Sequence, residues 1–426
     1  MKLFRLPRKI AFNAIFIYVA LFCVSTYALL EHTNIAIPAF SSIKSPLVLI
    51  GMICLATQFR TIFRCILKKH YFYMLLSLFV FFALLAISIV ANRHTTMGFS
   101  PFRYTFRMIM YCMEVFVLTL VLAETGRGSA ALTFLFWYVL GIVIVNDALL
   151  WTRAVSFGAS RFERFLVGTK FSVSYSHMNL LALGVIRGKW NLRKNLWGKL
   201  LILLAAFYLV LLSIRVDCMT GIIGCVVLVV LLYLLNSPRR KRMMWLTTPQ
   251  MLVLALAASV IFVFVVDGIL QLPFVEYLVE DVFDRDITIT GRTNIYGMYT
   301  RIMADRIWTG VGYGNGNSAA VALFGYENVQ NALLQWVLQV GIPATIGLVL
   351  VLAQVFSQIS RKNPQNMDKI LPLVALIYVY IILGTVETTF NMAFILWLAL
   401  IFMLVNEKKK VPLNRAAIMN RMEQAV

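Results

Sequence analysis

Long apolar runs dominate this chain and leave it few ways to fold. Residues 73–91 read "YMLLSLFVFFALLAISIVA", and residues 251–266 read "MLVLALAASVIFVFVV". A helix needs about 20 apolar residues to cross the hydrocarbon core of a bilayer, whereas a membrane β-strand shows only weak alternation over about 10 residues. Charged residues make up 13% of the chain, compared with about 25% in soluble domains. The sequence therefore predicts an all-α, polytopic membrane protein.

We predict about twelve transmembrane helices within a single integral membrane domain, residues 1–426. The expected spans are residues 11–30, 46–59, 72–91, 105–123, 130–150, 172–187, 199–214, 219–235, 251–267, 332–357, 370–386 and 390–405. The first run has the length of a span and no clear cleavage site, so we expect it to be retained. If the N-terminus is inside, about two thirds of the lysines and arginines face the cytoplasm. Both termini are therefore expected to be cytoplasmic.

The formal net charge of +21 does not require a nucleic-acid partner. Lysines and arginines collect in the cytoplasmic loops of membrane proteins, which explains a basic chain without nucleic acid. The six cysteines fall mostly inside apolar runs, with no paired spacing. We therefore expect small buried thiols, and neither disulfides nor a zinc site.

The basic residues expected on the outer side are mostly arginines. Lys44 and Lys170 are the only lysines there, and the arginines include Arg153, Arg161, Arg164, Arg215, Arg292, Arg301 and Arg306. Topology alone would not prefer arginine to lysine, whereas the planar guanidinium binds phosphate oxygens through two hydrogen bonds. Snorkelling and surface ion pairs are the alternative explanation. We predict a phosphate-bearing ligand on the outer face, held in part by the cluster of Arg153, Arg161, Arg164 and Lys170.

Residues 268–331 are predicted to form one large extracytoplasmic loop with its own helix. The helix should run from about Arg292 to Trp308, with Thr290 as its N-cap and Gly310 at its end. The expected apolar stripe consists of Ile295, Met298, Tyr299, Ile302 and Met303. Arg292 and Arg306 flank this stripe, while Arg301 points away from it. Since backbone N–H groups and the helix dipole favour an anion at a helix N-terminus, Arg292 is the foremost candidate for ligand contact.

The glycine run "GVGYGNGN", residues 310–317, resembles a nucleotide loop only superficially. It lacks the Lys-Ser/Thr pair of a P-loop, fits no G-x-G-x-x-G frame, and follows a helix instead of a strand. We expect a tightly turning loop in which Gly312 and Gly314 let the backbone approach a ligand.

These motifs together resemble the O-antigen ligase and polysaccharide polymerase superfamily. "TGRTNIYGMYTRIMADRIWTGVGYGN" and "VQNALLQWVLQVGIPATIGLVLVL" carry the resemblance over about sixty residues. The matching positions are Gly291, Arg292, Tyr296, Gly310, Gly312, Gly314, Asn331, Leu334, Gln335, Gly341 and Gly347. Family ligases carry a functionally important histidine where this chain has Gln330. Because glutamine cannot gain or lose a proton near neutral pH, Gln330 favours the polymerase branch. Arg215 resembles an arginine that ligases carry before the large loop.

The resemblance implies a GT-C-like glycosyltransferase bundle in the inner (plasma) membrane of a bacterium. Such a polymerase transfers glycan from an undecaprenyl-diphosphate carrier to another lipid-linked repeat unit on the outer face, as in capsule or exopolysaccharide synthesis. It uses no cofactor and no metal, and its partners include membrane lipid, a chain-length regulator and a flippase. A ligase-like transferase to a lipid or protein acceptor is the first alternative, and a flippase or other transporter is the second.

The implied reaction needs cations for the departing diphosphate and an acceptor for the proton of the attacking hydroxyl. Arg292 and Arg215 are the catalytic candidates for the first task. Glu327 and His177 are the candidates for the second, with surface solvation and helix packing as their respective structural alternatives. The remaining residues expected to bind substrate are Arg306, Gln330, Asn331, Gly312 and Gly314, besides the outer basic cluster.

Overall fold

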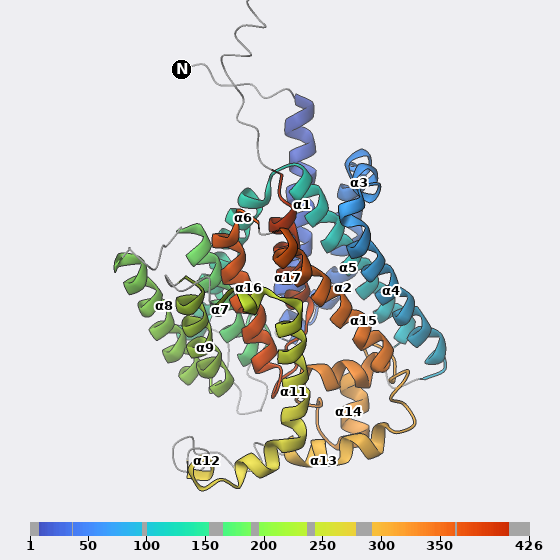
Figure 1. Ribbon diagram of the computed structural model, residues 1–426, viewed down its shortest axis with the longest axis vertical. Helices are drawn as coiled ribbons and strands as arrows, with labels where there is room; N and C mark the ends of the chain where they lie inside the picture. Colours follow the sequence, from blue (N-terminus) through green and yellow to red (C-terminus); the bar gives the residue numbers. More distant parts are fainter. Residues whose placement is uncertain are drawn as a thin grey trace, which may run out of the picture.

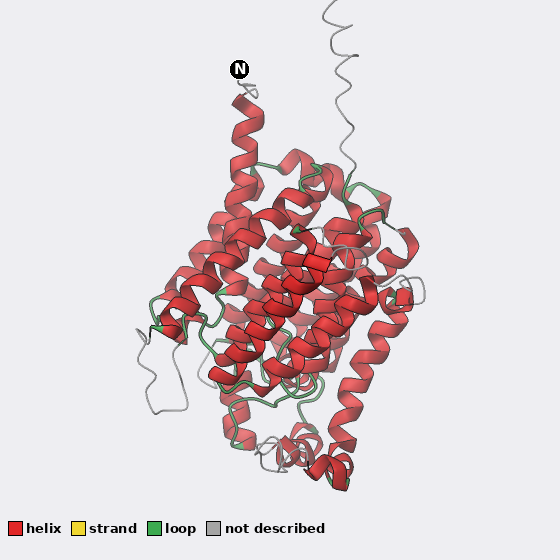
Figure 2. Cartoon of the chain, turned by 90° about the vertical axis from the view of Figure 1, so that its left-hand side faces the viewer, coloured by secondary structure: helices red, strands yellow, loops and turns green. Residues whose placement is uncertain are grey.

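The computed structural model describes residues 8–35, 37–95, 100–152, 165–188, 196–236, 243–277, 292–362 and 364–408. The helices are α1 (Arg8–Leu29), α2 (Phe40–Ala56), α3 (Phe59–Ile66), α4 (Lys69–Ala91), α5 (Pro101–Glu124), α6 (Gly128–Trp151), α7 (Lys170–Arg187), α8 (Leu196–Arg215), α9 (Met219–Asn236), α11 (Pro249–Leu270), α12 (Pro273–Tyr277), α13 (Arg292–Met303), α14 (Gly316–Phe324), α15 (Ala332–Lys362), α16 (Met367–Leu383) and α17 (Met392–Asn406), with 3-10 turns η1 (Thr33–Ile35) and η2 (Met244–Thr247). Among the described residues the ordered elements are helices joined by loops and turns (Figure 2), and one isolated bridge pairs Phe165 with Gly168. The all-α prediction is confirmed.

Each of the twelve predicted spans falls on a described helix. Six helices are long and apolar enough to cross a membrane, namely α4, α5, α6, α8, α11 and α15. The count rises to seven if α2 and α3, which meet at an angle of 81°, form one broken span. Apolar parts of α1, α9 and α17 are shorter. The membrane class is therefore confirmed, while the number of twelve spans stays a prediction.

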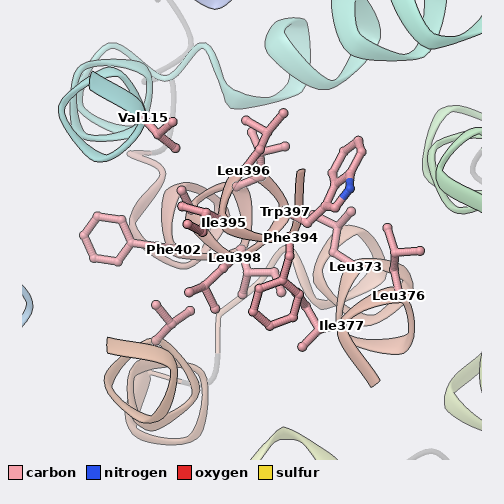
Figure 3. Packing of buried hydrophobic residues seen from close by; sticks show 14 of the residues in the cluster. Val115, Leu373, Leu376, Ile377, Phe394, Ile395, Leu396, Trp397, Leu398 and Phe402 are labelled. Atoms are coloured by element: carbon pink, nitrogen blue, oxygen red, sulfur yellow. The ribbon is translucent and has the colours of Figure 1, made fainter. Parts of the chain in front are cut away.

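Helix α17 lies at the centre of the bundle because its sequence is apolar in every direction. All its residues from Met392 to Val405 are buried, as expected for a helix without a polar face. Its side chains point both toward α5, at Val115, and toward α16, at Leu373 and Leu376 (Figure 3). The Asn391 side chain caps the helix by accepting a hydrogen bond of 3.1 Å from the Phe394 N–H.

Helices α12, α13 and α14 gather at one end of the bundle, which we call the loop end (Figure 1). α1 begins and α17 ends at the opposite end. A second apolar cluster at the loop end joins α11, α13, α14 and the start of α15. Within it, Tyr299 stacks on Phe324 and donates a hydrogen bond of 2.7 Å to the Leu334 carbonyl. The segment between α11 and α15 is therefore packed onto the helices that flank it.

Helix α13 begins at the predicted residue but ends earlier than predicted. It stops at Met303 instead of Trp308, so Arg306 lies in the turn that follows and is exposed. The predicted stripe is correct for Ile295, Tyr299 and Met303, which are buried. Met298 is 40% exposed, and Tyr296 takes its place on the buried face. Thr290, the predicted N-cap, lies outside the described residues.

The early end of α13 follows from a break in α15. The backbone of Gly341 has φ 80° and ψ 170°, which interrupts the helix and frees backbone groups on either side. The chain after α13 satisfies them, since Val311 N–H donates to the Leu338 carbonyl and Ile342 N–H donates to the Ile307 carbonyl. A broken span must find such partners because lipid offers none. Residues 307–311 are therefore held beside the break and do not continue α13.

Candidate functional site

The connection between α14 and α15 places Gln330 against two other segments of the loop end. Gln330 has a left-handed backbone, with φ 56°. The Tyr296 hydroxyl, from α13, lies 2.8 Å from the Gln330 carbonyl and 3.2 Å from the Thr385 carbonyl in the α16–α17 connection. The Ala332 N–H also donates to the Gly384 carbonyl at 2.8 Å. The Gln330 segment is thus fixed by α13 and by the α16–α17 connection.

Asn331 holds this arrangement together from a fully buried position. Its amide nitrogen lies 3.2 Å from the carbonyls of both Ser259 and Thr385, and its side-chain oxygen accepts from the Leu334 N–H at 3.0 Å. The residue therefore caps α15 and ties it to α11 and to the α16–α17 connection. The Asn331 side chain thus forms hydrogen bonds within the protein that need no ligand. Its predicted role in binding substrate stays a prediction.

The turn between α8 and α9 gathers charged groups at the end of these helices. Arg215 is the last residue of α8 and is exposed. Lys170, the first residue of α7, donates to the Asp217 carbonyl at 2.8 Å and lies 3.3 Å from its carboxylate. Asp217 has a left-handed backbone, with φ 51°. The structure thus brings Lys170 and Arg215 to one corner, as two of the predicted phosphate-binding residues.

Glu387 is an acidic residue at this end that the sequence analysis did not single out. It lies in the α16–α17 connection and is buried, with 5% of its surface exposed. Burial raises the pKa of the Cys218 thiol, and the nearby Glu387 charge contributes in the same direction. Glu387 therefore lies close to the α8–α9 turn, two residues after Thr385. Its isolated position in "TVETTF" gave no signal, because only the fold brings its connection to the α8–α9 turn.

His177 occupies a hydrogen-bonded network within α6, α7 and α8. Its Nδ1 lies 2.9 Å from the Val173 carbonyl, and its Nε2 lies 2.9 Å from Oδ2 of Asp147. The same carboxylate oxygen accepts the Tyr208 hydroxyl at 2.8 Å. A carbonyl only accepts hydrogen bonds, so Nδ1 carries a proton while Nε2 is committed to Asp147. Both ring nitrogens are engaged, and these contacts favour a role in joining the helices over the predicted role as a general base.

The glycines of residues 310–317 are explained by close packing. A Cβ on Gly312, with φ 90°, would lie 2.7 Å from Pro101, and one on Gly314, with φ 93°, would lie 2.7 Å from Tyr104. The Thr309 carbonyl accepts from Ser88 on α4 and from Asn92 directly after it. The predicted tight turn is therefore present, but it faces α4 and α5. The role of Gly312 and Gly314 in substrate binding stays a prediction.

The other predicted residues differ in how far the structure describes them. Arg292 starts α13, but its side chain lies outside the described residues, as do Arg153, Arg161 and Arg164 altogether. Glu327 is exposed in the turn after α14. Within the described ranges, no three His, Cys, Asp or Glu side chains gather as a metal site requires. All six cysteines are free and buried, as expected.

Replacing Tyr296 with phenylalanine should lower activity more than stability. The variant loses the hydroxyl that bridges the Gln330 and Thr385 carbonyls, while the ring stays. We expect the free energy of unfolding to fall by about 1 kcal/mol and transfer activity to fall by roughly tenfold or more, because the Gln330 segment shifts. Tyr299→Phe is the matched control, since it removes a similar buried hydroxyl from the same helix. Equal activity losses in both variants would contradict a specific role for Tyr296.

Comparison with known proteins found one family model that matches the chain from α9 into α15. Residues 218–349 match the family model described as O-antigen ligase, and this range contains α9, α11, α13, α14, Gln330, Asn331 and the break in α15. Curated proteins and solved structures gave no match. Together with the apolar helices, the family match implies a bacterial membrane protein. Residues 218–349 are therefore similar to the O-antigen ligase family, and the resemblance of this chain to the O-antigen ligase and polymerase superfamily is confirmed.

Proposed function

We propose that this protein is a polysaccharide repeat-unit polymerase. It transfers glycan from an undecaprenyl-diphosphate carrier to the sugar end of another lipid-linked repeat unit. The family match supports a glycan transferase related to O-antigen ligase, acting on lipid-linked oligosaccharide in the membrane. The polymerase assignment is our own and rests on one position in the match.

Gln330 is the observation that carries this assignment. It stands where ligases of the family carry a histidine, and its segment is fixed by Tyr296 and Asn331. A glutamine at this fixed position can donate and accept hydrogen bonds but cannot take up a proton near neutral pH. A reaction that relies on the ligase histidine is therefore disfavoured, whereas the polymerases of the superfamily vary more at this site.

The reaction requires a leaving diphosphate and a deprotonated nucleophile. The acceptor hydroxyl attacks the anomeric carbon of the donor glycan, the bond from that carbon to the diphosphate oxygen breaks, and the hydroxyl proton passes to a base. Arg292 and Arg215 would stabilise the charge that develops on the diphosphate. Lys170, with Arg153, Arg161 and Arg164, would hold the diphosphate of the second lipid. No metal or cofactor is part of the proposal.

The base is proposed among the carboxylates of the loop end. Glu327 lies three residues before Gln330 and is exposed. Glu387 is buried, lies two residues after Thr385, and acts electrostatically on Cys218 in the α8–α9 turn. We rank Glu387 above Glu327, because its connection is joined to the Gln330 segment through the Tyr296 hydroxyl at Thr385. His177 is ranked last because both ring nitrogens are engaged.

The proposed setting is the inner membrane, with both termini in the cytoplasm and the loop end outside. Twelve spans and a large outer loop, residues 268–331, complete this topology. The glycan would then be assembled where exported repeat units arrive. A flippase that supplies them and a regulator of chain length are the proposed protein partners.

Deletion of the protein in a cell with its own polysaccharide pathway tests the proposal. We expect the ladder of long lipid-linked chains to disappear while single repeats still reach the outer face, as measured by gel analysis and by mass spectrometry of lipid-linked products. Restoration by the wild-type gene controls for effects on neighbouring genes. Retained ladders with loss of transfer to a final acceptor would indicate a ligase, and repeats trapped inside would indicate a flippase.

A further inference from the structure

A cavity of about 530 Å³ opens at the opposite end of the bundle, away from the proposed transfer site. It lies between the α5–α6 turn, the α15–α16 connection and the end of α17. Its polar lining includes Ser129, Lys362, Asn366, Lys369 and Lys408. The volume lies in the range of about 300–1,000 Å³ that is typical of ligand sites. The transfer reaction gives this cavity no role.

The lining carries more positive than negative charge. Lys362, Lys369 and Lys408 line the cavity together with one carboxylate, Glu407. The Lys369 ammonium donates to the Ser129 hydroxyl at 2.6 Å, and the Lys362 ammonium donates to the side-chain oxygen of Asn406. Both acceptors are neutral, and across the described ranges neither lysine is within ion-pair distance of a carboxylate. Two cationic groups are therefore held in place by neutral acceptors, and among the described residues neither forms an ion pair with Glu407.

Glu407 holds the walls of the cavity together through hydrogen bonds. Its carboxylate accepts from the Ser129 N–H at 3.2 Å and from the Asn366 side chain at 3.0 Å. One residue thus connects α17, the start of α6 and the α15–α16 connection. The next residue, Lys408, pairs with Glu124, which Lys68 also contacts. The walls are therefore fixed relative to one another, and the positions of Lys362 and Lys369 are set before any ligand binds.

We propose that this cavity binds the phosphate of an anionic phospholipid headgroup. The cavity lies where the apolar helices α6, α15, α16 and α17 begin or end, which is the depth of the headgroups. Lysine ammonium groups bind phosphate as point charges, and basic pockets between membrane helices recognise anionic headgroups. Helix α6 begins at the cavity and exposes Trp137, 59% of its surface, about two turns further along. The apolar face of α6 at Trp137 can contact the acyl chains of a bound lipid. Free phosphate has no acyl chains and would make no such contact.

Lipid binding to the full-length protein in neutral detergent tests this proposal. Native mass spectrometry would measure binding of dioleoyl-phosphatidylglycerol, with dioleoyl-phosphatidylcholine as the neutral comparison. We expect one phosphatidylglycerol to bind the wild type in preference to phosphatidylcholine. The double variant Lys362→Gln with Lys369→Gln should bind it about thirtyfold more weakly, since each basic residue near anionic lipid contributes about a factor of five. Lys69→Gln is the matched control, because Lys69 is an exposed lysine at the start of α4 outside the cavity.

Three results would overturn the proposal. The first is equal phosphatidylglycerol binding by the wild type and the double variant, and the second is equal loss in the Lys69→Gln control. The third is saturation by millimolar inorganic phosphate with no preference between the two lipids, which would assign the cavity to a free anion. If the double variant does not purify as a single species, Lys369→Glu and Lys369→Arg replace it. The arginine variant should then bind as the wild type does, and the glutamate variant should not.

Discussion

Replacing Arg292 with lysine is expected to abolish most transfer activity although the positive charge is kept. Arg292 is the first residue of α13, where free backbone N–H groups and the helix dipole favour an anion. A guanidinium can grip two oxygens of the departing diphosphate at once, whereas an ammonium cannot match that planar geometry. Loss of one preorganised donor to a transition state typically costs about 10²–10³ in rate. We therefore expect Arg292→Lys to be at least about a hundredfold slower.

The measurement is polymer formation by purified protein from defined lipid-linked repeats. Arg301→Lys makes the same exchange on the same helix at an exposed position and should leave the rate unchanged. If Arg292 binds two diphosphate oxygens, KM should change less than kcat. The reason is that this contact strengthens as the bond between the sugar and the diphosphate breaks. Wild-type activity in Arg292→Lys would refute the proposed role.

The helices and the start of α13 could be predicted from the sequence because each depends on local information. Apolar runs of span length mark the helices, and the spacing of Ile295, Tyr299 and Met303 marks the buried face of α13. The end of α13 depends instead on residues 307–311 meeting the break at Gly341, some thirty residues further along. No local pattern near Trp308 carries that information. The error therefore arises from tertiary hydrogen bonding.

The candidate site shows the same division between local and distant information. The family motif identifies Gln330 and Arg292, since both lie within one matching segment. Glu387 lies outside that segment and became a candidate only because the α16–α17 connection packs beside the α8–α9 turn. His177 was a candidate because histidine can act as a general base. Its partner Asp147, thirty residues away on another helix, was not apparent from the sequence. Hydrogen-bond partners, which the sequence does not show, decide whether a buried polar side chain is free to react.

Replacing Gly341 with alanine should unfold or misassemble the loop end. The backbone at φ 80° and ψ 170° is in a region open essentially to glycine alone, and forcing another residue there costs about 1–3 kcal/mol. A Cβ at this position would also lie 2.2 Å from the Trp308 carbonyl oxygen, a backbone atom that cannot move without breaking the pairing of residues 307–311. The total destabilisation should exceed about 3 kcal/mol, which is a large share of the stability of an ordinary domain.

A glycine-to-alanine exchange elsewhere in the same region separates this strain from a general effect of the methyl group. Gly297 lies in α13 with nothing near its absent Cβ, so Gly297→Ala should be neutral or slightly stabilising. The measurements are the midpoint of unfolding in detergent and the rate of proteolysis between α11 and α15. If α15 straightens in Gly341→Ala, its first segment turns away from Tyr296 and carries Gln330 with it. Activity should then fall even at temperatures where the rest of the bundle stays folded. Equal activity and equal unfolding midpoints in Gly341→Ala and Gly297→Ala would show that the break does not position the site.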